Sequence, residues 1–298
     1  QGLGALPGEW IEAEPVIAQL ADSLLQRLCE VGDQVLWQKF SAGRGPGVML
    51  LAHLGTGGDG SGPPVRDHYE AFIRGHRRDG LASLLGEFPL LGRWIGIVVS
   101  LWQEASAELL RRVWTDREEL EARFGLPSGH RLCGVTQGLS DPHRGGRAVA
   151  VLRFGGRDHT HDPGTPIDSA AETGAGPAAE SSNPDAMRIV YKPKDMGVDA
   201  AYQAALADLN AHSSLPPLRT LTVSVHQGYG YMEFVPHRLC GDAAELDRFY
   251  ANAGRLLAVL HLLGCTDCHH ENLMACGDQL LLIDTETLLE PEIGRAHV

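Results

Sequence analysis

Apolar residues in the first part of the chain recur every three or four positions, which is the spacing of one face of an α-helix. Between residues 14 and 40 this spacing is kept by Val16, Ile17, Leu20, Leu24, Leu25, Leu28, Val31, Val35 and Leu36. The pattern returns at 65–78 and from 81 to 124, where Pro89 is expected to open a helix or bend the chain. We therefore expect residues 1–130 to be mainly helical, apart from a Gly- and Pro-rich loop at 42–64.

Alternation of apolar and polar residues, which is typical of strands, replaces the helical spacing in the second half of the chain. Strands are predicted at 147–154, 187–191, 220–225, 229–235 and 279–283. Helices are predicted at 198–209 and 243–263. This order predicts an α+β protein in which a small sheet with one helix is followed by a second helical region that ends in a strand.

The segment between the first two strands, about 156–186, contains few large apolar residues and is rich in Gly, Ala, Ser and Pro. Such a composition cannot repay the entropy of ordering, so we expect a disordered insertion in a hairpin. His159 and His161 lie in this segment. A metal site there is one interpretation, but solvated loop histidines are far commoner.

The charge balance excludes some classes of function. The chain has 38 acidic and 25 basic residues, for a net charge of −13, which opposes dedicated nucleic-acid binding but leaves a local basic cleft possible. The longest strongly apolar run, Trp94 to Trp102, is shorter than the roughly 20 residues that cross a bilayer. Six cysteines in a chain of this size do not form a disulfide scaffold. We expect a soluble, cytoplasmic protein without a transmembrane segment.

Both ends of the sequence suggest a piece of a longer protein. The chain begins with Gln1 instead of Met, and it stops soon after the strand at 279–283. Residues 292–298 (EIGRAHV) match the translation of a common sequencing adapter followed by a stop codon. We expect this tail to be an artefact.

The polar residues with the clearest chemistry lie in a loop and after a strand. The loop places Asp267, His269 and Asn272 in a D-x-H-x-x-N pattern, and the strand at 279–283 is followed by Asp284 and Glu286. Phosphoryl transfer needs a carboxylate near the acceptor hydroxyl, an amide oxygen and a second carboxylate for Mg²⁺, and a lysine on the nucleotide phosphates.

Lys192 ends an upstream strand, where a kinase-like fold keeps its phosphate lysine, so lysine and loop follow the kinase order. Each part also has a simpler interpretation. A lysine at the end of a strand is usually solvated. An Asp in the position of Asp284 is more often a capping or turn residue than a metal ligand, and Asp267 suits the N-cap of a helix as well as it suits a catalytic loop. A third interpretation is a zinc site formed by Cys265, Cys268, His269, His270 and Cys276.

Longer segments carry a more specific resemblance. Four segments, at 140–154, 188–194, 228–235 and 262–291, resemble the dehydratase domain of class II (LanM-type) lanthipeptide synthetases. The helical stretches at 68–94 and 111–125 resemble the part of that family that precedes its kinase-like lobes.

The resemblance implies a helical N-terminal region followed by a lipid-kinase-like, two-lobed core. The helical region would cover 1–130, the N-lobe 131–236 and an incomplete C-lobe 237–291. The implied activity uses ATP and Mg²⁺ to phosphorylate Ser and Thr of a ribosomally made precursor peptide. Elimination of phosphate then leaves dehydroalanine or dehydrobutyrine.

The resemblance also implies roles for single residues. Lys192 would contact the ATP phosphates, and Asn272 and Asp284 would hold Mg²⁺ with support from Glu286. Asp267 would orient or deprotonate the substrate hydroxyl, with His269 beside it in the catalytic loop.

For the elimination step the family points to Asp141 and His143, which without the resemblance are an ordinary turn. Gly145 and Gly146 would let the backbone approach phosphate, and Phe234 with the next residue would form the interlobe linker.

The chain also departs from the family. The hairpin insertion is longer than the resemblance requires, and the family's further elimination residues and its zinc-dependent cyclase would lie downstream of Glu286. Activity of this piece alone is therefore not expected. The alternative to an enzyme is a non-catalytic scaffold that binds the leader peptide of the precursor.

Overall fold

The computed structural model describes residues 8, 10–42, 65–138, 140, 145–155 and 186–289. Residues 43–64 of the loop expected at 42–64, nearly all of the expected insertion and the tail at 292–298 lie outside the described residues. Asp141, His143, His159 and His161 lie outside them as well. The chain divides into two compact units, one of residues 17–110 and 142–147 and one of residues 1–16, 111–141 and 148–298.

The first unit is helical. It contains most of α1 (Ala13–Ala42) and α5 (Pro89–Thr115), together with α3 (Val65–Arg78) and α4 (Ala82–Glu87). The indole of Trp102 donates a hydrogen bond of 3.0 Å to the carbonyl of Leu20, which joins α5 to α1. The rings of Phe40 and Phe72, 5.4 Å apart, join α1 to α3. The described residues of this unit are therefore mainly helical, as the spacing of apolar residues predicts.

The long helical run predicted from 81 to 124 is divided in the structure. It forms α4, α5 and α6 (Arg117–Phe124), and Pro89 is the first residue of α5, as predicted. Proline suits this position because the first N–H groups of a helix have no partner within the helix. The break before α6 is at Asp116, whose backbone leaves the helical conformation.

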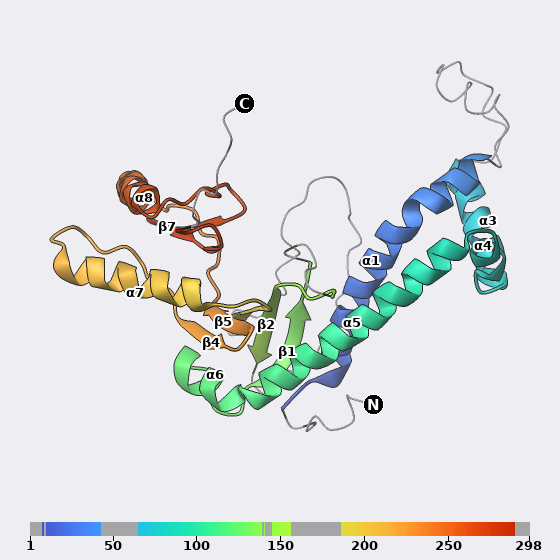
Figure 1. Cartoon of the computed structure of the whole chain (residues 1–298), viewed down its shortest axis with the longest axis horizontal. Helices are drawn as coiled ribbons and strands as arrows, with labels where there is room; N and C mark the ends of the chain where they lie inside the picture. Colours follow the sequence, from blue (N-terminus) through green and yellow to red (C-terminus); the bar gives the residue numbers. More distant parts are fainter. Residues whose placement is uncertain are drawn as a thin grey trace, which may run out of the picture. The chain divides into compact units, whose positions relative to one another are not determined.

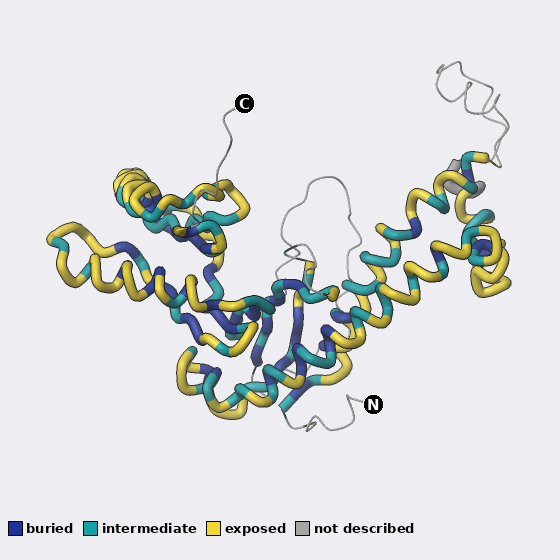
Figure 2. The backbone as a smooth tube through the Cα atoms, viewed as in Figure 1, coloured by how far each residue is buried: buried dark blue, intermediate teal, exposed yellow. Residues whose placement is uncertain are grey.

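The second unit contains a five-stranded antiparallel sheet in the order β1-β2-β3-β5-β4. Its strands are β1 (Arg131–Thr136), β2 (Ala150–Gly155), β3 (Met187–Lys192), β4 (Val223–His226) and β5 (Tyr229–Glu233) (Figure 1). Leu132, Leu152, Phe154, Ile189 and Tyr231 are fully buried and form its core. Figure 2 shows this sheet as the most continuously buried part of the chain.

Two helices and a hairpin complete this unit: α7 (Gly197–His212), α8 (Ala243–Leu262), β6 (Leu273–Cys276) and β7 (Gln279–Leu282). Asp242 caps α8 by accepting a 2.7 Å hydrogen bond from the backbone N–H of Glu245. Tyr202 and Leu206 of α7 pack with Leu256 and Leu260 of α8 and with Leu282 of β7. These contacts hold the end of α8, where the next loop starts, and Leu282 pairs with Leu273, the first residue of β6, where that loop ends.

The α+β prediction is confirmed, and most predicted strands and helices are present with their ends within three residues of those predicted. The strands β1 and β6 were not predicted. No helix in the described part of the chain is both long enough and apolar enough to cross a membrane.

Candidate functional site

The loop after α8 begins at Gly264, whose φ of +62° is in the left-handed region that favours glycine. The N–H of Cys265 still bonds to the carbonyl of Leu260 at 2.9 Å, so the helix end is closed. Further along, the N–H of Leu289 donates to the carbonyl of Leu263 at 3.0 Å. The loop therefore starts from a point that is bonded to the chain segment after β7.

The structure brings Asp267, His269 and Asn272 together within this loop. The amide Nδ2 of Asn272 donates to Asp267 Oδ2 at 3.0 Å and to the Asp267 carbonyl at 2.9 Å. The ring Nε2 of His269 lies 3.2 Å from Asp267 Oδ1. Both carboxylate oxygens of Asp267 thus have a neighbour that limits rotation of the side chain, although the group remains about half exposed.

The loop is also bonded to the segment that carries Asp284 and Glu286. The N–H of Ile283 donates to the carbonyl of Asn272 at 2.9 Å. The N–H of Asp267 donates to the hydroxyl of Thr287 at 3.2 Å. Two predicted parts of the site, the polar loop and the D-T-E segment, are therefore adjacent.

Lys192, the last residue of β3 in the five-stranded sheet, contacts the segment that carries Asp284. Its side chain is buried, and its Nζ donates to the carbonyl of Ile283 at 2.5 Å. Its charge is paired with Asp199 of α7, whose Oδ1 lies 3.2 Å away and which is 1% exposed. Burial lowers the pKa of Lys192, and the negative charge of Asp199 opposes this shift.

Lys194 lies two residues further on and holds both acids of the D-T-E segment. Its Nζ is 2.7 Å from Asp284 Oδ1 and 2.8 Å from Glu286 Oε1. Burial alone would raise the pKa of Asp284, but the hydrogen bond from Lys194 and the charge of Lys192 lower it. Burial would likewise lower the pKa of Lys194, and its two acidic partners raise it.

Sequence reasoning missed Asp199 and Lys194. Asp199 is the acid in the first turn of the helix that follows Lys192, so a search for a carboxylate partner of that lysine would have found it. Lys194 belongs to the same K-P-K segment as Lys192. Its role becomes visible only when the D-T-E segment lies beside it.

This arrangement can be compared with known proteins. Residues 88–297, more than half of the chain, match the family described as "Domain of unknown function (DUF4135)". The chain belongs to the DUF4135 family.

A curated relative of this DUF4135 chain is the "Lacticin 481/lactococcin biosynthesis protein LcnDR2" of Lactococcus lactis subsp. lactis. The two are 26% identical over 112 residues, which is 34% of this chain and 12% of the relative. The chain therefore spans about an eighth of the length of the relative. The family match and this relative support the resemblance to LanM-type lanthipeptide synthetases that the sequence motifs indicate.

The donor atoms of the candidate site in this DUF4135 chain suit a hard cation. Mg²⁺ prefers carboxylate and amide oxygens, and Asp284 and Asn272 provide one of each. The lowered pKa of Asp284 keeps its carboxylate ionised. Asn272 uses its Nδ2 to bond Asp267, so its amide oxygen is the atom that a cation would contact.

The zinc interpretation of the cysteine and histidine cluster is not supported. Cys265 and Cys268 pack beside the cluster around Tyr202 and Leu256. Cys276 belongs to a different cluster, around Met196 and Met232. Across the described ranges, no group of three or more His, Cys, Asp or Glu side chains is arranged to hold a metal ion.

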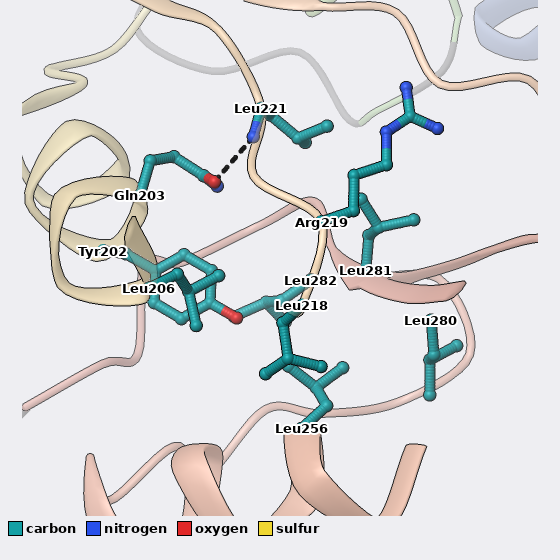
Figure 3. Close-up of a pocket in the computed structure, with 10 residues that line it drawn as sticks. All are labelled: Tyr202, Gln203, Leu206, Leu218, Arg219, Leu221, Leu256, Leu280, Leu281 and Leu282. Carbon is teal, nitrogen blue, oxygen red and sulfur yellow. Dashed lines mark hydrogen bonds between the residues drawn. The ribbon is translucent and has the colours of Figure 1, made fainter. Parts of the chain in front are cut away.

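A small hollow in this unit does not coincide with the polar site. Its ten lining residues, shown in Figure 3, are mostly leucines from the packing of α7, α8 and β7, and Lys192 and Asp284 are not among them. The buried hydroxyl of Tyr202 has no hydrogen-bond partner among the described residues. The hollow has room for about one water molecule, which could satisfy this hydroxyl.

The remaining predicted residues are placed as follows. Gly145 and Gly146 have φ near +80°, and a Cβ on Gly146 would come within 3.1 Å of the Leu101 side chain. The close approach of this turn to α5 therefore explains glycine at Gly146 without a phosphate.

The guanidinium group of Arg188 lies over the ring of Phe234, and its central carbon is 4.0 Å from the ring centre. The proposed linker role of Phe234 stays a prediction, as do the roles of Asp141 and His143.

Proposed function

We propose that this chain provides the kinase-like site of a LanM-type dehydratase, which phosphorylates Ser and Thr of a precursor peptide with ATP and Mg²⁺ and then eliminates phosphate. One observation carries the proposal. The Nζ of Lys192, at the end of β3, donates to the carbonyl of Ile283, and the N–H of Ile283 donates to the carbonyl of Asn272 in the polar loop. Ile283 thus links the strand that carries Lys192, the polar loop and the segment that carries Asp284, although Lys192 and Ile283 are 91 residues apart.

Lys192 is suited to bind nucleotide phosphates because its charge is buried and its position is fixed. Asp199 and the Ile283 carbonyl hold the ammonium group in one orientation. A positioned cation of this kind stabilises the negative charge of the transferred phosphoryl group more than a mobile surface lysine would. We assign Asp199 the role of a positioning residue that acts through Lys192.

Asn272 and Asp284 would hold Mg²⁺, which supplies positive charge to the phosphate oxygens in the transition state. Lys194 keeps the Asp284 and Glu286 carboxylates close together before nucleotide binds. Without the Lys194 ammonium group, the ionised carboxylates of Asp284 and Glu286 would repel each other. Lys194 therefore preserves the acidic part of the site.

Asp267 is the group that would orient the substrate hydroxyl and accept its proton. Asn272 and His269 hold its two oxygens, and its backbone N–H is bonded to Thr287. A carboxylate held in this way can be presented to a Ser or Thr hydroxyl at hydrogen-bond distance. Elimination of the phosphate would then fall to Asp141 and His143, as the family resemblance implies.

Nucleotide binding tests the proposal on the chain as it stands. Calorimetry with ATP and Mg²⁺ should detect binding that Lys192→Ala and Asp284→Ala each weaken by about tenfold or more. Lys39, the one other lysine besides Lys194, lies in the helical unit, so Lys39→Ala is the matched control. Equal affinity in all variants, together with binding of the leader peptide, would support the scaffold interpretation instead.

The chemistry is tested by mass spectrometry of the precursor peptide after incubation with ATP in the intact synthetase. Asp267→Asn should abolish phosphorylation, whereas Asp208→Asn, an exposed acid on α7, should not. Asp141→Ala or His143→Ala should let phosphorylated peptide accumulate. Unimpaired dehydration in the Asp267, Asp141 and His143 variants would refute the assignment.

A further inference from the structure

Two thiols border the loop aspartate, and the proposed function does not use them. Cys265 and Cys268 are free cysteines of intermediate burial. Their sulfur atoms are 2.7 Å apart, and the thiol of Cys268 donates to the sulfur of Cys265. Bonded sulfur atoms in a disulfide are about 2.05 Å apart, so a small movement separates this pair from a covalent bond.

The same distance does not suit a bound metal. A tetrahedral zinc ion holds each thiolate at about 2.3 Å, which places two sulfur ligands about 3.8 Å apart. The two sulfurs are already much closer than that. Oxidation to a disulfide fits the pair better than coordination does.

The surroundings give the two thiols different properties. Burial, followed by the hydrogen bond and the charge of Cys265, raises the pKa of the Cys268 thiol to about 12. Cys268 therefore keeps its proton and acts as the donor of the pair. The sulfur of Cys265 accepts this hydrogen bond and also lies 3.6 Å from the Thr287 hydroxyl, so Cys265 is the better placed attacking group.

We propose that Cys265 and Cys268 form a reversible modification site at which a small-molecule disulfide oxidises the two thiols to an intramolecular disulfide. Cys265 attacks one sulfur of the oxidant, whose other half leaves as a thiol. Cys268 then attacks Cys265 and releases the second half as a thiol, and each protein thiol proton passes to a leaving group. The S–S bond of the oxidant and the two S–H bonds of the protein are broken. The S–S bond of the protein and the S–H bonds of the two released thiols form in their place, so atoms and electrons balance.

The modification would act on the polar loop, and this part of the inference rests on the proposed function. Asp267 lies between the two cysteines, and its N–H bonds to the same Thr287 hydroxyl that Cys265 contacts. A disulfide would draw Cys265 towards Cys268 and away from Thr287. The turn that presents the Asp267 carboxylate would then change shape.

Peptide mapping of the full chain tests the site without nucleotide. The chain is treated with oxidised glutathione, alkylated, and cleaved after Glu245 and Glu271, which releases a fragment with Cys265 and Cys268 as its only cysteines. The expected fragment is unalkylated and about 2 Da lighter than the reduced one. In Cys268→Ser, glutathione should instead remain on Cys265.

The exposed Cys29 serves as an internal control for the oxidant, and Cys240→Ser should leave the fragment unchanged. A fragment that is fully alkylated in a sample whose Cys29 carries glutathione would overturn the proposal. This result does not depend on whether the chain binds ATP, so it is separate from a failure of the proposed function.

Peptide phosphorylation tests the effect on the loop. Oxidation should lower the rate by about tenfold or more, because small displacements of a catalytic group have effects of this size, and dithiothreitol should restore it. The rate of Cys265→Ser should not respond to the oxidant. This assay uses the intact synthetase, and an oxidised enzyme that phosphorylates the peptide as fast as the dithiothreitol-treated enzyme would refute the link between the disulfide and the loop.

Discussion

The buried pair of Lys192 and Asp199 allows a quantitative prediction. The two groups are 5% and 1% exposed, and Nζ and Oδ1 lie 3.2 Å apart. At an effective dielectric constant of about 20, two unit charges at this distance attract by about 5 kcal/mol. The cost of burying both charges offsets much of this, but removing one partner leaves the other buried and unpaired, which typically costs about 3–5 kcal/mol.

We therefore expect Asp199→Asn and Lys192→Met each to lower the free energy of unfolding by about 3 kcal/mol, as measured by urea denaturation. The double variant should lose far less than the sum, because no unpaired charge remains in it. Asp208→Asn, on the exposed side of the same helix, should change stability by about 0.5 kcal/mol or less. Additive losses in the double variant would refute the reasoning.

The same pair predicts a dependence on pH. Burial lowers the pKa of Lys192 from its ordinary value of 10.5, so between the two values the unfolded chain binds more protons than the folded chain. Stability contributed by this group therefore rises with pH across that window. Asp199→Asn removes a charge that raises this pKa, so the rise should begin at a lower pH. A variant with an unchanged pH profile of stability would contradict this assignment.

Substitutions at Gly230 and Asp116 test the packing around the sheet, and Gly254 on α8 provides a control for the first. Gly230→Ala should destabilise the chain by about 1–3 kcal/mol in thermal or urea unfolding, because its Cβ would clash with the Ser224 carbonyl oxygen of β4. Gly254→Ala, with open space on α8, should stabilise by about 0.5–1 kcal/mol. Equal effects of the two substitutions would contradict the close approach at Gly230. Asp116→Ala should cost about 2–4 kcal/mol, because the hydroxyls of Tyr229 and Tyr231 both donate to that carboxylate at 2.8–2.9 Å, and the loss should largely disappear when both tyrosines are Phe.

The sequence predicted the elements of the site better than the contacts within it. The apolar strand before Asp284 and the long apolar helix before Asp267 are regular patterns, and both are present in the structure. The pairing of Lys192 with Asp199 depends on how α7 packs on the sheet, which periodicity does not report. Lys194 was missed for a related reason, since its acidic partners are 90 and 92 residues away.

The missed strands have local causes. The strand β1 contains Gly134 and departs from regular pairing between Leu132 and that glycine, so its burial pattern is not a strict alternation. The strand β6 is only four residues long and follows a polar loop. Short strands of this kind are defined by their hydrogen-bonded neighbours, here β7, more than by their own composition.

The main chain of one residue, Ile283, has a consequence for how this site tolerates variation. Both polar atoms of the Ile283 main chain are engaged, the N–H with the loop and the carbonyl with Lys192. Every amino acid except proline carries the same two atoms. The side chain at this position is therefore free to change in size or branching during evolution while the junction persists. Proline is the single replacement that would delete the donor and uncouple the loop from the strand.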